Sequence, residues 1–259
     1  MILAIDVGNT NIVLGGIADG QQIFSARLAS DRNKTADQYA LDIQGLLTMH
    51  NIDTGDIEGG ILSSVVPYLQ TVIPQAVKSL TGLDLLVVGP GMKTGLNICM
   101  DDPGTVGSDL IVSAVAARAK YPAPIAIIDM GTATTITVID AEGRYIGGMI
   151  IPGLWVSVNA LSARAAQLPY IDLNGPTKLL GKNTVDCMRS GAVIGTAAML
   201  DGIIARMEEE MGSPVSAVLT GGVAPLVIPY CTRRFHLEPD ILIAGLQILY
   251  AKNKPLQAE

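Results

Sequence analysis

The sequence has few of the residues that build disulfide frameworks or zinc sites. It contains three cysteines, Cys99, Cys187 and Cys231, and two histidines, His50 and His236. The cysteines are odd in number, widely spaced and without a C-x-x-C pair, so neither a disulfide framework nor a zinc site is predicted. We expect all three thiols to be buried and chemically inert.

Long apolar runs are also missing. Hydrophobic residues make up 49% of the chain and charged residues 16%, which is typical of a globular protein. Every long apolar stretch is interrupted by Gly, Pro or Asp, and none approaches the roughly 18 residues of a membrane helix. Met1 leads directly into a predicted strand that carries Asp6, without the basic segment of an export signal. The sequence therefore predicts a cytoplasmic protein without a membrane segment.

Positive charge is scarce. The chain has 17 Lys and Arg against 24 Asp and Glu, a formal net charge of −7, and its basic residues form no cluster. Proteins that bind nucleic acid usually present a basic face, so no nucleic-acid partner is predicted. At 259 residues, the chain can form one large domain or two of about 120 residues each.

One short pattern occurs twice. Residues 2–17 read ILAIDVGNTNIVLGGI and residues 125–139 read IAIIDMGTATTITVI. In both copies an apolar strand ends in Asp, turns through Gly with Asn or Thr, and enters a second apolar strand. Glycine lets the backbone approach a ligand closely, and the polar groups suit a phosphate and its cation. We interpret the copies as phosphate-binding turns. Two ordinary hairpins, with Asp and Asn chosen for turn chemistry, are the alternative.

Strands followed by helices also occur twice along the chain. Periodicity and turn residues predict strands at 2–6, 11–17, 21–28, 60–66, 83–88, within 125–139, at 144–151 and at 215–219, and helices at 35–49, from Pro67 onward, at 107–120, 153–166, 185–211 and 239–251. This succession indicates an α/β architecture with two related halves. We place the two domains at residues 1–119 and 120–259.

Two further segments carry candidate chemistry. Asp109 falls at the start of the helix predicted at 107–120, where it is either a first-turn acid that stabilises the helix dipole or a general base. The segment 219–222, Leu-Thr-Gly-Gly, is either a plain turn from strand to helix or a place where the backbone passes close to a nucleoside. The sequence alone does not separate these alternatives.

Several motifs, in order over nearly the full length, resemble those of type III pantothenate kinases. They are DVGNTN at 6–11, SSVVP at 63–67, VGPG at 88–91 with TGL at 94–96, DMGTATT at 129–135, GG at 147–148 with PG at 152–153, and GKNT at 181–184. Sugar kinases share the first turn but not this ensemble. The resemblance implies an α/β fold of two duplicated actin-like (ribonuclease H-like) domains with a nucleotide cleft between them.

The resemblance also implies an activity. It is the ATP-dependent phosphorylation of pantothenate to 4'-phosphopantothenate, the first step of coenzyme A biosynthesis, carried out by a homodimer with Mg²⁺ accompanying ATP. The implied ATP-binding residues are Asp6, Val7, Gly8, Asn9, Thr10, Asn11, Ile12, Val13 and Thr132. The implied pantothenate-binding residues are Met100, Gly107, Ser108, Asp109, Leu110 and Thr184, with Thr184 reaching the site from the partner subunit. Asp109 would be the base, and Asp129 would bind a monovalent cation, K⁺ or NH₄⁺.

Two positions depart from the family pattern. Leu110 stands where an arginine is usual, and Met100 where an aromatic residue is common. Leucine cannot replace a charge-assisted hydrogen bond, which is worth about 1.5–3 kcal/mol. Another basic side chain, Arg164 or one from a partner subunit, could supply the charge. Alternatively, the chain is a kinase for another small hydroxylated substrate or a non-enzymatic accessory paralogue that influences transcription.

Overall fold

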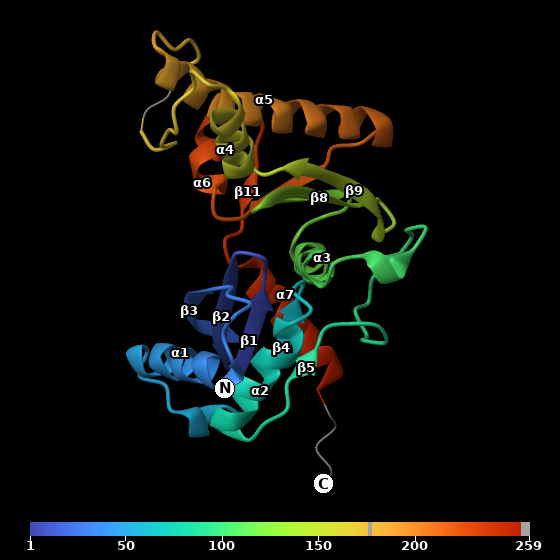
Figure 1. Cartoon of the computed structure of the whole chain (residues 1–259). Coiled ribbons are helices and arrows are strands. Elements are labelled where there is room, and N and C mark those ends of the chain that lie inside the picture. The colour runs from blue at the N-terminus through green and yellow to red at the C-terminus, as the bar shows by residue number, and fades with distance from the viewer. Residues whose placement is uncertain (176–177, 255–259) are drawn as a thin grey trace. The chain divides into compact units, whose positions relative to one another are not determined.

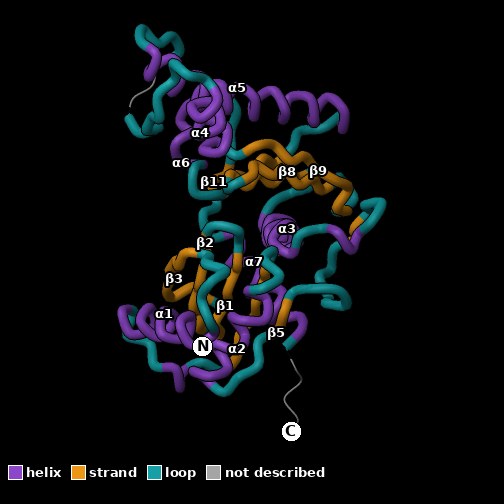
Figure 2. Tube along the Cα trace, viewed as in Figure 1, coloured by secondary structure: helices purple, strands orange, loops and turns teal. Residues whose placement is uncertain are grey.

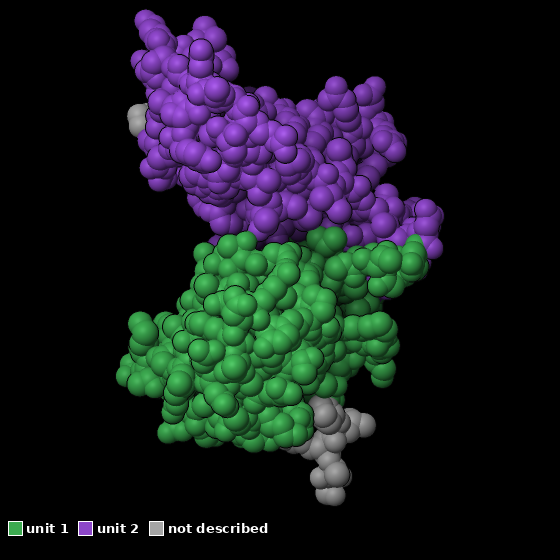
Figure 3. All heavy atoms as spheres, in the orientation of Figure 1, with its two compact units in different colours: residues 1–95, 102–116, 240–259 green, residues 96–101, 117–239 purple. Residues whose placement is uncertain are grey.

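The computed structural model describes residues 1–175 and 178–254, which form two compact units (Figure 3). Unit 1 contains residues 1–95, 102–116 and the described residues from 240 onward, and unit 2 contains residues 96–101 and 117–239. Each unit is built on a mixed β-sheet covered by helices (Figures 1 and 2). This division differs from the expected one at residues 119 and 120, chiefly because the last helix belongs to unit 1.

The sheet of unit 1 has the strand order β3-β2-β1-β4-β5. The strands are β1 (Ile2–Val7), β2 (Asn11–Ala18), β3 (Gln21–Ala29), β4 (Gly59–Ser64) and β5 (Leu86–Val87). β1 is antiparallel to β2 and parallel to β4. Alternate residues of β1, Leu3, Ile5 and Val7, belong to one buried cluster with α1 (Ala36–Met49) and α2 (Leu69–Thr81). Asp6 therefore points to the opposite face of the sheet.

That opposite face is covered by α7 (Ile241–Asn253), which contacts β1, β2 and β4. Two glycines permit this packing. A Cβ added at Gly15 in β2 would lie 2.7 Å from the Ile243 side chain, and one at Gly245 would lie 2.1 Å from the Val112 carbonyl oxygen in α3 (Ser108–Lys120). The last helix of the chain thus completes the unit that the first strand begins.

The sheet of unit 2 repeats this plan, with the order β11-β10-β7-β8-β9-β6. Its strands are β6 (Asn97–Ile98), β7 (Ile125–Met130), β8 (Ala133–Ile139), β9 (Arg144–Pro152), β10 (Ser216–Thr220) and β11 (His236–Leu237). β7 is antiparallel to β8 and parallel to β10, as β1 is to β2 and β4. The two sheets therefore share one topology, apart from the extra edge strand β6, and the predicted α/β duplication is confirmed.

One face of the second sheet carries α4 (Leu154–Arg164) and α5 (Thr184–Met211), as Figure 1 shows. α5 is long and apolar enough to cross a membrane by length and composition alone, and a third of its most apolar window is buried. Its polar groups bond within unit 2: Asp201 accepts from the Thr232 and Arg233 backbone N–H groups, and Ser190 donates to the Leu179 carbonyl. These contacts are typical of a helix that packs within its own domain.

Short elements complete the chain. They are α6 (Ala224–Val227) and the 3₁₀ turns at Thr54–Asp56, Pro103–Thr105 and Ile228–Tyr230. Most predicted strands and helices agree with the structure to within two residues, but the strand predicted at 83–88 is only Leu86–Val87. The helix expected from Pro67 begins at Leu69, because Pro67 lies in the turn before it.

The expectation of three buried thiols is wrong. Cys99 and Cys187 are exposed, and Cys231 is half-buried. Burial, with a smaller contribution from nearby Asp201, raises the pKa of the Cys231 thiol to about 11. Only Cys231 therefore has the surroundings of an inert thiol.

Candidate active site

The first of the two repeated turns, residues 8–10, joins β1 to β2. The Gly8 N–H donates to the Asn11 carbonyl at 2.9 Å and closes the turn. Asp6, two residues earlier, is 5% exposed and lies opposite Val13 of β2 and Ser63 of β4 in the sheet register. A carboxylate and a hydroxyl-bearing residue thus stand side by side where two parallel strands end. The ends of such strands are where α/β sheets bind ligands.

Ser63 connects this sheet end to the start of α3. Its Oγ donates to Ser108 Oγ at 3.0 Å, and Ser108 Oγ donates to the Ser64 carbonyl at 3.2 Å. Ser63 is fully buried and Ser108 is half-buried, so the bond between them is partly shielded from water. The structure therefore brings the predicted substrate segment 107–110 next to the row of cross-strand neighbours Val13, Asp6 and Ser63.

Asp109 occupies the first turn of α3 and is half-buried. Burial raises the pKa of its carboxyl group, while hydrogen bonds from the Leu110 backbone N–H, at 2.8 Å, and from its own N–H lower it in part. A carboxylate with a raised pKa is a stronger proton acceptor than an ordinary one. The surroundings of Asp109 are therefore suited to a general base.

The second turn, residues 131–132, joins β7 to β8 and is one residue shorter. The Gly131 N–H donates to the Ala133 carbonyl at 3.0 Å. Two other glycines lie against the turn and the strand before it. A Cβ on Gly153 would lie 2.2 Å from the Thr132 carbonyl oxygen, and one on Gly221, where φ is +98°, would lie 2.5 Å from the Met130 backbone. Close approach within unit 2 therefore explains the glycine at position 221.

Asp129 lies in β7 opposite Thr135 of β8 and Thr220 of β10. Carboxylate and hydroxyl oxygens are the ligands that hard cations prefer, and this row supplies no nitrogen or sulfur. No group of three or more His, Cys, Asp or Glu in the described part of the chain could hold a metal ion. The oxygen atoms of this row fit a hard cation.

The remaining predicted site residues lie on other elements of unit 2. Met100 follows β6 and approaches β9, where a Cβ on Gly147 would lie 3.9 Å from its Sδ. Thr184 is exposed at the first position of α5, after the N-cap Asn183.

Sequence reasoning assigned no role to two residues that shape the site in unit 1. Ser30 donates from its Oγ to the Gly8 carbonyl at 2.6 Å, and Ser63 makes the link to α3. Ser63 is 45 residues from Ser108, and no local pattern predicts a contact at that distance along the chain. Ser30 is likewise 22 residues from Gly8.

Unit 2 also contains an apolar cavity of about 500 Å³. Its walls come from β8, β9, α4 and α5 and include Thr134, Leu161, Cys187, Met188 and Met199. Thr134 is the second residue after the second turn, so one side of the cavity adjoins the predicted nucleotide-binding segment.

The duplicated sheets resemble those of solved structures. A Baf family protein from Campylobacter jejuni, described as a transcriptional activator, matches with a TM-score of 0.58 at 16% identity, over 98% of this chain and all of that one. The ROK hexokinase from Thermus thermophilus matches with a TM-score of 0.50 at 14% identity, over 96% of both chains. Together with the repeated turns, these likenesses show an α/β fold of two duplicated actin-like domains.

Sequence comparison narrows this class. Residues 2–206 match the family model for type III pantothenate kinase. The type III pantothenate kinase of Moorella thermoacetica is 44% identical over 253 residues, which cover 98% of this chain and all of the relative. The chain therefore belongs to the type III pantothenate kinase family.

Proposed function

We propose that this protein transfers the γ-phosphoryl group of ATP to pantothenate, giving 4'-phosphopantothenate in the first step of coenzyme A biosynthesis. Family membership over the whole chain supports this activity. The structural observation that supports it is the bond between the end of β4, at Ser63, and Ser108, the residue before Asp109.

Asp109 acts as the base. Its carboxylate accepts the proton of the pantothenate hydroxyl while the hydroxyl oxygen attacks the γ-phosphorus. The new O–P bond forms as the bond to the β,γ-bridging oxygen breaks, and ADP leaves. Positioning and charge stabilisation supply most of the acceleration in such transfers. The raised pKa of Asp109 contributes to the proton transfer.

Each unit contributes one of the two repeated turns. Residues 6–13 of unit 1 bind the phosphates, with backbone N–H groups and the Asn9 and Thr10 side chains as donors. An added Cβ at Gly131 would have only ordinary contacts, 3.6 Å from the Ala133 carbonyl oxygen, so protein packing does not demand glycine there. This supports close approach of a ligand to the second turn, where Thr132 contacts ATP.

Cations complete the charge balance. Mg²⁺ accompanies ATP and neutralises part of its phosphate charge. Asp129, with Thr135 and Thr220 on the neighbouring strands, holds a monovalent cation, K⁺ or NH₄⁺. Only oxygen ligands are present in this row, which suits such an ion.

Pantothenate is bound by residues 107–110, Met100, and Thr184 of a second copy of the chain. Unit 2 exposes many large apolar side chains, which supports a homodimer. They include Ile146, Met149, Ile150, Trp155, Val156, Leu161, Tyr170, Leu179 and Leu180. The enzyme would work in the cytoplasm, where ATP and pantothenate are available, without nucleic-acid or membrane partners.

The test is a direct assay. Purified protein is incubated with ATP, Mg²⁺, K⁺ and pantothenate, and phosphopantothenate is measured by mass spectrometry. Product that depends on all of these components supports the proposal. If ATP and pantothenate bind but no product forms, the accessory role gains support instead. If a panel of small alcohols gives a better acceptor, the substrate assignment is wrong while the kinase chemistry stands.

A further inference from the structure

The loop of residues 30–34, which follows β3, is bound directly to the first turn. The Ser30 backbone N–H donates to the Thr10 carbonyl at 2.9 Å, and Ser30 Oγ donates to the Gly8 carbonyl at 2.6 Å. The two bonds engage the residues on either side of Asn9. Any movement of this loop would therefore be transmitted to the turn.

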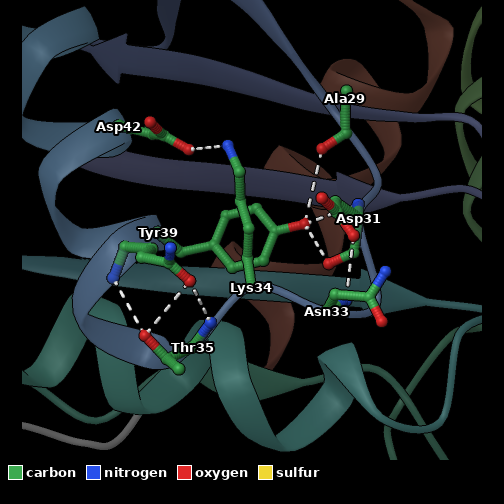
Figure 4. Close-up of polar contacts among 8 residues, drawn as sticks. Ala29, Asp31, Asn33, Lys34, Thr35, Tyr39 and Asp42 are labelled. Carbon is green, nitrogen blue, oxygen red and sulfur yellow. Dashed lines mark hydrogen bonds and ion pairs between the residues drawn. The ribbon is translucent and has the colours of Figure 1, made fainter.

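A buried tyrosine fixes the loop in place (Figure 4). The Tyr39 hydroxyl accepts from the Asp31 backbone N–H at 2.8 Å and lies 2.9 Å from the Asp31 carbonyl oxygen, to which it can donate. Lys34, at the other end of the loop, bonds to Asp42 at 2.7 Å and lies over the Tyr39 ring. Tyr39 is fully buried in α1, so a rigid helix sets the conformation of residues 31–34.

Arg32 is carried by this fixed loop to the side of the turn. Its Nη2 donates to Asn9 Oδ1 at 3.3 Å, the side chain is exposed, and it forms no ion pair with any residue that the structure describes. Because a guanidinium group can only donate, the oxygen of the Asn9 amide must face it. Both N–H donors of the Asn9 amide then remain on the side of the amide away from Arg32.

We propose that Arg32 is a further phosphate-binding residue of this kinase, and that its guanidinium group contacts non-bridging oxygens of the β- or γ-phosphate of ATP. The inference rests on the proposed function and extends the nucleotide site beyond residues 6–13. A guanidinium group has five donors, and the bond to Asn9 uses one of them. Its fork geometry matches phosphate oxygens. Arg32 also brings a positive charge to a unit in which Leu110 cannot supply one.

The test compares nucleotides that differ only in phosphate number. Binding of ATP, ADP and AMP is measured by calorimetry for the wild type, Arg32→Ala, Arg32→Lys and Arg206→Ala. Arg206 is an exposed arginine on α5 of unit 2, whose Nη1 donates to the Gly202 carbonyl of its own helix, and it controls for the loss of one charge. We expect Arg32→Ala to weaken ATP binding about ten-fold, as for a lost charge-assisted hydrogen bond. AMP binding should change less than about two-fold, Arg32→Lys should restore part of the ATP affinity, and Arg206→Ala should change nothing.

A second set of variants tests the positioning by the loop. Ser30→Ala removes the Oγ bond to Gly8, and its effect on ATP affinity should not add to that of Arg32→Ala, because both act through one contact. Equal losses for ATP and AMP, unchanged ATP affinity in Arg32→Ala, or a loss matched by Arg206→Ala would each overturn the inference. Binding is measured without pantothenate. A wild type that binds ATP but makes no phosphopantothenate would refute the proposed reaction with pantothenate. The effect of Arg32→Ala on ATP binding could still be interpreted. A wild type that binds no ATP would overturn both the role of Arg32 and the proposed function.

Discussion

The two repeated turns join corresponding strands of the two sheets but are stabilised differently. In unit 1, three residues join β1 to β2, and the turn is bonded to a neighbouring loop through Ser30. In unit 2, two residues join β7 to β8, and Gly153 lies against them with its N–H bonded to the Thr132 carbonyl at 3.2 Å. One turn is thus held by side chains from outside, and the other by close backbone packing.

This difference fits the roles that we propose for the two units. The side chains gathered at the first turn, Asp6, Ser63 and Asp109 with Arg32 nearby, are polar or charged and suited to the reacting groups. The second turn offers small hydroxyl-bearing residues and a close-packed backbone, suited to holding a nucleotide and a cation. The predictions below test this comparison, each with a matched control or an internal reference.

The largest effect is expected for Asp109→Asn. Without its base, kcat should fall by about 10²- to 10⁴-fold while ATP still binds. Because the folded-state pKa of Asp109 is raised, the stability that its protonated form contributes is present below the ordinary pKa and is lost as pH rises through the raised value. Asp109→Asn should therefore be more stable than wild type at neutral pH but not in acid. Wild-type kcat should fall as pH drops through the raised pKa.

Asp37→Asn is the matched control, because Asp37 is also an acid in the first turn of a helix. It should lose about 0.3–1 kcal/mol of stability and keep its activity. Steady-state kinetics and thermal unfolding against pH distinguish the cases. If Asp109→Asn is destabilised like Asp37→Asn and retains full turnover, Asp109 is only a helix-capping acid.

Gly153→Ala tests the backbone packing of the second turn. The added methyl group would meet the Thr132 and Gly131 carbonyl oxygens at 2.2 and 2.5 Å, so a loss of about 1–3 kcal/mol is expected in denaturant unfolding. ATP affinity should fall with it. Gly8→Ala should be milder in stability, since its Cβ would lie 3.2 Å from the Asn11 carbonyl oxygen.

Gly45→Ala provides the control for the glycine-to-alanine change itself. Gly45 is inside α1 with no atom within 4 Å of an added Cβ, so the substitution should stabilise the protein by about 0.5–1 kcal/mol. A destabilisation by Gly153→Ala no larger than that by Gly8→Ala would show that the two turns do not differ in packing as we describe.

Leu161→Glu tests the apolar surface of unit 2. Leu161 is 48% exposed on α4, and a charge there should prevent close association of two copies, giving a monomer in light scattering after size-exclusion chromatography. Leu41→Glu, at a leucine that is 69% exposed on α1 of unit 1, should leave the dimer intact. Dissociation by both variants, or by neither, would argue against this surface as the interface.

The smallest effect concerns thiol reactivity within unit 2. A thiol with a pKa of about 11 is ionised to about one part in a thousand at pH 8, so Cys231 should react slowly with a disulfide reagent. Cys99 and Cys187 are exposed and should react quickly. Titration of the native protein should therefore show two fast thiols and one slow thiol. Three slow thiols would restore the expectation made from the sequence.

Local patterns predicted the strands and helices well because each carries its own signal. Thr35 illustrates this: it caps α1 by accepting from the Gln38 N–H, while Gln38 bonds back to the Thr35 N–H, so the helix begins where the sequence indicates. The repeated strand and turn pattern predicted the duplicated topology in the same way, since both copies encode it separately.

What the sequence did not reveal depends on contacts between distant segments. The bond between Ser63 and Ser108, the placement of α7 in unit 1, and the exposure of Cys99 all follow from tertiary packing. β6 and β11 are two residues each, too short to leave a periodic pattern. The resemblance identified candidate residues, and the structure supplied the contacts around Asp109 and the loop that carries Arg32.

The position of α7 has a consequence for synthesis on the ribosome. Strands β1 and β4 emerge early, but the helix that covers one of their faces is translated only after all of unit 2. Until then the apolar sheet surface that receives Ile243, Leu246 and Leu249 stays uncovered. We expect the nascent first half to need a chaperone, or a partly folded second half, before it becomes stable.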